Sequence, residues 1–227
     1  MVDTHCYILG INSVFHESAA CLLKDGRIIA AVEEERFTRV KHTKPARVDN
    51  PDILPLNAIS FCLEKANITW DDISFIGYSF DPKKRIQKIT PSQQKKVITI
   101  KGLKEGGWGT IEGEEIFHSK LKNIPQKLSQ LAQKELADKF LWLPHHLCHA
   151  GSAYFVSPYQ EAAVLVIDGT GELETTTLYK GKENLLSTID AIVYPNSLGF
   201  LWEKISVLMG FSQYDATKIM GDRKSVV

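Results

Sequence analysis

The strongest constraint on the fold is a pattern of strand, polar loop, strand, tight turn, strand and helix that occurs twice. In the first copy the sequence predicts three strands and a helix, at 6–12, 18–23, 28–32 and 55–66. In the second copy it predicts the same elements at 162–167, 175–179, 185–189 and 197–209. The hairpin turns are predicted at Asp25-Gly26 and at Lys180-Gly181-Lys182. Asn12 then aligns with Asp168, and Asp25 with Gly181.

Duplication of a βββα unit builds the actin-like, sugar-kinase-like ATPase (ASKHA) fold. This is an α/β fold whose ligands bind in the cleft between its two halves. We therefore predict a first actin-like subdomain at 1–160 and the start of a second one at 161–227. The alternative is that two unrelated β-meanders resemble each other.

Residues 81–120 interrupt this pattern and are predicted to form an insertion or a flexible loop, because they show little hydrophobic periodicity. They contain several glycines, at positions 102, 106, 107, 109 and 113. Within 83–104 the charged residues are all basic, namely Lys83, Lys84, Arg85, Lys88, Lys95, Lys96, Lys101 and Lys104. This run is either a solvated insertion or a patch that binds phosphate or a polymer.

The composition is that of an ordinary globular protein. The 27 basic residues balance the 27 acidic ones, so the overall charge favours neither nucleic acid nor a membrane as a partner. The four cysteines form no CxxC pair and are predicted to be buried, reduced thiols. The N-terminus lacks the features of a signal peptide, and no apolar run is long enough to span a membrane. We therefore expect a cytoplasmic protein.

Two histidines and an aspartate form the candidate metal site. His145 and His149 are four residues apart, so they share one face of a predicted helix at 145–156. Asp168 follows a predicted strand, which would deliver its carboxylate to the same site. This ligand set suits iron or zinc and leaves coordination positions open. The motif is not the HExxH of zinc proteases because position 146 is His, and we expect His146 to pack or to hydrogen-bond behind the ligands.

Two loops add further candidates. Asp168 begins a glycine-rich turn, Gly169-Thr170-Gly171-Glu172, whose backbone N–H groups could hold an anionic group. His16 lies in the matching loop of the first copy, where it is either a general base or a hydrogen-bonded loop residue. The charged run at 33–42 is either a solvated strand exit or a clamp for phosphate or carbamate oxygens.

Several motifs, in order, resemble those of one family. They are Leu9-Gly10-Ile11-Asn12 with Phe15-His16-Glu17-Ser18-Ala19-Ala20, the run 33–42, the stretch 145–150, the stretch 166–172, and Asn196-Ser197-Leu198-Gly199. Together they are similar to the O-carbamoyltransferases of antibiotic and nodulation-factor biosynthesis. The metal domain of that family is similar to the universal tRNA threonylcarbamoyltransferase.

The resemblance implies a reaction and a set of roles. The family makes carbamoyl-adenylate from carbamoyl phosphate and ATP in a separate domain, and then transfers the carbamoyl group to a hydroxyl of a small-molecule acceptor. By resemblance, His145, His149 and Asp168 hold Fe²⁺, His16 deprotonates the acceptor, and Lys41 lies in the substrate cleft. The residues matched to nucleotide binding are Gly169, Thr170, Gly171, Glu172 and Gly199.

The chain departs from the family at its end. A Glu-x-Lys-x-Met-Gly motif of the family is replaced by Asp215-Ala216-Thr217-Lys218-Ile219-Met220-Gly221, and little sequence follows. We therefore expect a truncated second half and an N-terminal fragment of a carbamoyltransferase. The alternatives are one half of a split enzyme that needs a partner chain, a non-catalytic remnant, and an actin-like ATPase or sugar kinase.

Overall fold

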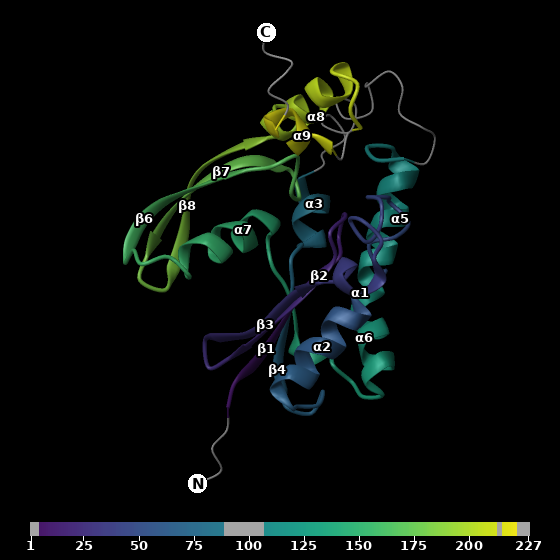
Figure 1. The fold of residues 1–227 in the computed structure, drawn as a ribbon, viewed down its shortest axis with the longest axis vertical. Helices are drawn as coiled ribbons and strands as arrows, with labels where there is room; N and C mark the ends of the chain where they lie inside the picture. Colours follow the sequence, from purple (N-terminus) through teal and green to yellow (C-terminus); the bar gives the residue numbers. More distant parts are fainter. Residues whose placement is uncertain (1–4, 89–106, 213–214, 222–227) are drawn as a thin grey trace. The chain divides into compact units, whose positions relative to one another are not determined.

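A computed structural model describes residues 5–88, 107–212 and 215–221 (Figure 1). The chain divides into two compact units, Met1–Leu143 and Pro144–Val227. The first contains a mixed five-stranded sheet and the second an antiparallel three-stranded sheet, each accompanied by helices. The predicted α/β class is therefore confirmed. Within the described residues, no helix is long and apolar enough to cross a membrane.

The sheet of the first unit has the order β3-β2-β1-β4-β5. Its strands are β1 (Tyr7–Asn12), β2 (Ala19–Lys24), β3 (Arg27–Glu33), β4 (Ile73–Tyr78) and β5 (Phe140–Trp142). The first three form an antiparallel meander, whereas β4 pairs parallel to β1 and β5 parallel to β4. Asp25 and Gly26 both have positive φ angles in the β2–β3 turn, as the Asp-Gly pair predicts.

Among its described residues, the first unit has the helices α1 (Glu35–Thr38), α2 (Leu56–Ala66), α3 (Pro82–Lys88), α5 (Ile111–Lys122) and α6 (Ile124–Ala132), with a short 3₁₀ helix η1 (Ala137–Lys139). The sequence predicts α2 correctly at 55–66, and the helix ends at Asn67, whose backbone is left-handed. Buried Glu34 caps the N-terminus of α2 by accepting from the backbone N–H groups of Asn57 and Ala58. Part of the charged run at 33–42 is therefore structural.

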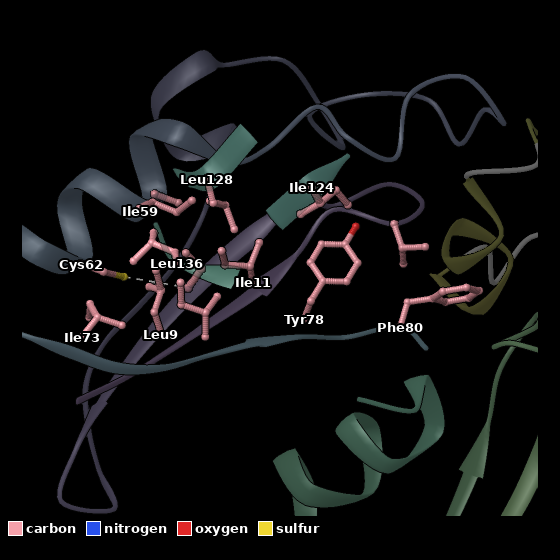
Figure 2. Packing of buried hydrophobic residues seen from close by; sticks show 14 of the residues in the cluster. Leu9, Ile11, Ile59, Cys62, Ile73, Tyr78, Phe80, Ile124, Leu128 and Leu136 are labelled. Carbon is pink, nitrogen blue, oxygen red and sulfur yellow. Dashed lines mark hydrogen bonds between the residues drawn. The ribbon is translucent and has the colours of Figure 1, made fainter. Parts of the chain in front are cut away.

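The core of the first unit lies between the sheet and the helices (Figure 2). Alternate residues of β1 point into it, and Leu9 and Ile11 are buried there together with Ile59 of α2 and Leu128 of α6. Tyr78 is also fully buried, and its hydroxyl satisfies its hydrogen-bonding capacity with Ser13 Oγ (3.1 Å) and Pro51 O (3.2 Å). This core anchors the strand ends from which the loops of the unit emerge.

The second unit is a meander flanked by helices. Its strands are β6 (Glu161–Ile167), β7 (Glu174–Lys182) and β8 (Leu185–Val193), and its helices are α7 (His145–Tyr154), α8 (Leu198–Leu208) and α9 (Thr217–Gly221). Helix α7 packs on β6 and β7, where Ala150, Val166 and Tyr179 form a small buried cluster. Both units therefore contain a three-stranded meander followed by a helix. Their common origin as halves of an actin-like fold stays a prediction.

Four details differ from the sequence-based prediction. The second hairpin turn is at 183–184, where Glu183 has φ 54°, and not at 180–182. Gly181 belongs to β7 because the Tyr154 ring packs over it, so close that an added Cβ would lie 2.6 Å from the ring. The spacing of Leu128, Leu131, Leu136 and Phe140 predicts a helix from Ile124 to Phe140, but this helix ends at Ala132, since Gln133 turns left-handed. Of the four cysteines only Cys62 is buried; the others are half-buried, and none forms a disulfide.

The domain boundary and the insertion also differ. The compact units divide before α7 and not at residue 160, because α7 packs on the second sheet. The segment 81–120, predicted as an insertion or a flexible loop, contains α3 and most of α5, so it is not a loop throughout; that it is an insertion stays a prediction. Arg85 of α3 pairs with Glu114 of α5 at 2.6 Å and lies over the Trp108 and Phe117 rings. The basic residues 95–104 lie outside the described residues.

Candidate functional site

The helix that carries the two histidines begins at the first of them. Pro144 precedes α7 and offers no side-chain cap. Instead, buried Glu172 accepts hydrogen bonds from the backbone N–H of His145, at 2.9 and 3.2 Å to its two carboxylate oxygens. A carboxylate at a helix N-terminus satisfies an orphan donor and is stabilised by the helix dipole. The hairpin loop after β6 therefore fixes the first turn of α7.

The three predicted metal ligands lie together in the second unit. His145 Nε2 is 3.1 Å from His149 Nε2 and 3.2 Å from Asp168 Oδ2, and His149 Nε2 is 3.8 Å from the same oxygen. All three ligand atoms lie within 4.8 Å of one another. Two imidazole nitrogens and one carboxylate oxygen converging on a point suit a zinc or ferrous ion and leave positions for other ligands. The residues present therefore fit the predicted metal.

The electrostatics of this cluster favour an ionised Asp168 and a neutral His149, the forms that bind metal. Burial would raise the pKa of Asp168, but the hydrogen bond and charge of His145 outweigh it and hold that pKa below the ordinary value. Burial, followed by the neighbouring charge of His145, lowers the pKa of His149. The side chain of His149 is half exposed, whereas that of His145 is almost covered.

His146 stands behind these ligands, as the sequence predicts. Its side chain is buried, and Nδ1 lies 2.7 Å from Thr177 Oγ1 on β7. Its Nε2 is 3.9 Å from Asp168 Oδ2, too far for a hydrogen bond. Burial lowers the pKa of His146 to about 4, so this ring is neutral at physiological pH. It packs against the ligand carboxylate without belonging to the converging set of three donors.

The glycine-rich turn is held tightly to the start of α8. Ser197 Oγ donates to the backbone oxygens of Asp168 and Gly169, and Gly169 N–H donates to Asp168 Oδ1 at 2.6 Å. A Cβ on Gly199 would lie 2.5 Å from Gly169 N, so only glycine allows this approach. Gly171 is also close to a neighbour, although less so, since its Cβ would lie 3.0 Å from the His146 ring. These glycines position Asp168.

The predicted nucleotide contacts have other roles in this structure. Glu172 caps α7, and the half-buried Thr170 lies within 3.4 Å of Gly171 O. Gly169, Gly171 and Gly199 serve close backbone packing. Binding of a nucleotide by these five residues stays a prediction.

A second cluster lies in the first unit, around the predicted base His16. Glu17, which follows it in the β1–β2 loop, places Oε2 at 3.5 Å from His16 Nδ1 and Oε1 at 3.1 Å from His42 Nδ1. The side chains of His16, Glu17 and His42 form a second group of donors within 4.8 Å of one another. The nearby His16, and then the hydrogen bond and charge of His42, lower the pKa of Glu17 to about 2, although burial opposes them.

The predicted cleft lysine, Lys41, is exposed on the segment after α1, next to His42. The buried lysine of this segment is Lys44, whose ammonium donates to the backbone oxygens of Ser13 and Asn50. Burial lowers the pKa of Lys44 to about 8. Lys44 therefore ties this segment to the end of β1, and the role of Lys41 stays a prediction.

Sequence reasoning missed Glu17, His42 and Thr177 as neighbours of the candidate residues. Glu17 is adjacent to His16, so its place in the quoted motif was a usable signal. His42 and Thr177 are brought in by tertiary structure, from 25 and 31 residues away from Glu17 and His146 respectively. No local spacing predicts such contacts.

Comparisons with known proteins agree with these motifs. The model of a family described as "Carbamoyltransferase N-terminus" matches residues 7–224. The uncharacterized protein sll1178 of Synechocystis is 34% identical over 221 residues, which are 95% of this chain and 34% of that protein. The nodulation protein NolNO of Sinorhizobium fredii is 29% identical over 215 residues, 92% of this chain and 28% of that protein. The chain thus spans about a third of the length of these relatives.

Solved structures were also compared. YeaZ from Pseudomonas aeruginosa matches with a TM-score of 0.46 and 14% identity, covering 84% of this chain and 68% of that one. The family match covers almost the whole chain. It includes both candidate clusters, one formed by His16, Glu17 and His42 and the other by His145, His149 and Asp168. The chain therefore belongs to the carbamoyltransferase N-terminus family.

Proposed function

We propose that this chain contributes to the transfer of a carbamoyl group from carbamoyl-adenylate to a hydroxyl of a small-molecule acceptor. The observation that carries the proposal is the convergence of His145 Nε2, His149 Nε2 and Asp168 Oδ2 in a chain of this family. Carbamoyl-adenylate would be made from carbamoyl phosphate and ATP. Because the chain spans about a third of its relatives, the full reaction belongs to the proposal for the longer family protein.

Each cluster has a distinct task in this proposal. His145, His149 and Asp168 would hold Fe²⁺ or Zn²⁺, which when bound neutralises negative charge on phosphate oxygens. Gly169, Thr170, Gly171, Glu172 and Gly199 would shape the nucleotide contact of the same unit. His16 would accept the proton of the acceptor hydroxyl, because a neutral imidazole is a base near neutral pH. Lys41, exposed and cationic, would attract the anionic donor.

A binding experiment tests the metal and nucleotide parts together. The chain is loaded with Fe²⁺ without oxygen, or with Zn²⁺, and titrated by calorimetry with a hydrolysis-resistant carbamoyl-adenylate analogue that keeps its phosphate. Binding that requires the metal, and that His145→Ala/His149→Ala abolishes, supports the proposal. His16→Ala is the matched control, since it should leave analogue binding intact. Equal binding with and without metal would contradict the proposal.

We propose further that the second unit binds a partner polypeptide that supplies the rest of the family's machinery. The sheet face away from α7 exposes Leu165, Ile167, Leu185 and Ile189, each more than half accessible. Neighbouring α8 exposes several more apolar side chains, namely Leu198, Leu201, Ile205, Val207 and Leu208. An exposed cluster of apolar side chains of this kind is typical of a protein interface.

Co-expression tests this second proposal. The probe is the part of sll1178 that this chain does not match, and light scattering after size-exclusion chromatography measures complex formation. A stable complex with the wild-type chain, lost with Leu165→Asp/Ile189→Asp, supports the proposal. Ile111→Asp is the control, because it removes an exposed apolar residue at the start of α5, where an acid is well tolerated. A wild-type chain that stays uncomplexed would contradict it.

A further inference from the structure

The β1–β2 loop of the first unit holds Glu17 rigidly. Glu17 has a left-handed backbone (φ 55°), and its N–H donates to His42 O at 2.9 Å. Asn12 Nδ2 donates to Glu17 O at 3.2 Å. A non-glycine residue in this conformation persists only where its surroundings hold it. The backbone of Glu17, from which its carboxylate projects, is therefore held in place by these hydrogen bonds.

The partner histidine is fixed as well. His42 also has a positive φ of 61°, and its N–H donates to Glu35 Oε2 at 2.8 Å. The His16 and His42 rings meet edge to face, with centroids 5.9 Å apart. The two imidazoles are thus brought together from separate segments, with the Glu17 carboxylate between them.

The contacts of the carboxylate determine which ring nitrogens carry protons. Each carboxylate oxygen of Glu17 lies near one ring: Oε1 is 3.1 Å from His42 Nδ1, and Oε2 is 3.5 Å from His16 Nδ1. The His42 contact is a hydrogen bond, and an ionised carboxylate can only accept one, so His42 Nδ1 must carry the hydrogen. The His16 contact is an ion-pair distance without a hydrogen bond, at which the carboxylate attracts a hydrogen on Nδ1 and repels a lone pair there. A neutral imidazole protonated on Nδ1 has its basic lone pair on Nε2.

We propose that Glu17 is a positioning residue that holds His16 and His42 as Nδ1–H tautomers, so that Nε2 of His16 is the atom that accepts the proton of the acceptor hydroxyl. The inference rests on the proposed function for this last step only. The Glu17 carboxylate stays ionised throughout the physiological range, since its pKa is about 2. The role matches that of the carboxylate that orients the histidine in hydrolytic triads.

Nuclear magnetic resonance of ¹⁵N-histidine-labelled protein tests the tautomers directly. Long-range ¹H–¹⁵N spectra would be recorded near pH 8.5, about two units above the ordinary imidazole pKa. We expect unprotonated Nε2 in both His16 and His42. Glu17→Gln offers one carbonyl and one NH₂ group, so one of the two rings should switch to the Nε2–H tautomer. Glu17→Ala should release both rings, and Glu17→Asp should restore the wild-type pattern in at least one.

His5 is the internal control. Its Nδ1 lies 2.7 Å from Asp25 Oδ2 on an exposed hairpin, so its Nδ1–H tautomer should persist in every Glu17 variant. The proposal is overturned if His16 is protonated on Nε2 in the wild type, or if Glu17→Gln and Glu17→Ala change neither ring. It is also overturned if one equivalent of Zn²⁺ shifts both rings in a His145→Ala/His149→Ala background, because the cluster would then be a metal site.

The outcome separates this inference from the proposed function. Expected tautomers in a chain that binds no carbamoyl-adenylate analogue would leave the positioning role of Glu17 standing and contradict the proposed function. Metal-dependent analogue binding, together with His16 and His42 tautomers that are the same in every Glu17 variant, would support the proposed function and overturn the positioning role of Glu17.

Discussion

Replacement of Glu172 should weaken both the second unit and its proposed metal centre. In Glu172→Ala the buried N–H of His145 loses its acceptor, and an unsatisfied buried donor costs about 1–3 kcal/mol. Loss of the negative charge at the start of α7 adds roughly 0.3–1 kcal/mol. Glu172→Gln keeps an acceptor of the same size, so it should lose only the smaller of these contributions. The first turn of α7 carries His145, so its loosening should also lower metal affinity.

Urea unfolding followed by circular dichroism measures the stability change, and competition with a chromophoric chelator measures the affinity for Zn²⁺. Glu161→Gln is the control, because the Glu161 side chain forms an exposed ion pair with Lys180 in the same unit, and such pairs contribute little to stability. The expected order of stability is wild type and Glu161→Gln, then Glu172→Gln, then Glu172→Ala. A Glu172→Ala chain as stable and as tightly metal-binding as the control would refute this account of the α7 cap.

Three further predictions concern packing, charge and helix ends. Gly199→Ala should lower the free energy of unfolding by about 1–3 kcal/mol and reduce Zn²⁺ affinity, since its Cβ would overlap the backbone at Asp168. Gly151→Ala in α7 has room for a Cβ and should change neither quantity. Urea unfolding and chelator competition measure the two effects. The pKa of Lys44 is about 8 in the folded chain and 10.5 in the unfolded chain, so between about pH 8 and 10.5 the unfolded chain binds more protons. The stability of the wild type relative to Lys44→Met should therefore rise with pH in this range. Urea midpoints measured at several pH values test this. Gln133→Gly should stabilise by about 1 kcal/mol in the same assay, because glycine adopts the left-handed C-cap of α6 without a Cβ penalty.

The proximity of the three candidate ligands was predictable because each step depends on local spacing. Histidines four apart share a helix face, and an apolar strand delivers the residue that follows it, so His145, His149 and Asp168 needed no tertiary information. The Asp25-Gly26 turn was predictable for the same reason, since the backbone conformation follows from the residue types.

What supports the site was not predictable from spacing. Glu172 resembles a phosphate-binding loop residue in sequence, yet the fold turns its carboxylate to the N-terminus of α7. Gly181 resembles a turn residue, yet it lies in a strand because the Tyr154 ring needs the space. Glu17 meets His42 only because the segment after α1 returns to the β1–β2 loop. Each of these contacts depends on tertiary packing, which overrides local preference.

The central claim is that His145, His149 and Asp168 form a metal centre, and equilibrium dialysis with metal analysis tests it most directly. The chain is dialysed against Zn²⁺, and separately against Fe²⁺ without oxygen, and the bound metal per chain is measured. The account predicts one ion in the wild type and in His16→Ala/His42→Ala, and its loss in His145→Ala/His149→Ala. Equal metal content in the wild type and in His145→Ala/His149→Ala would contradict it.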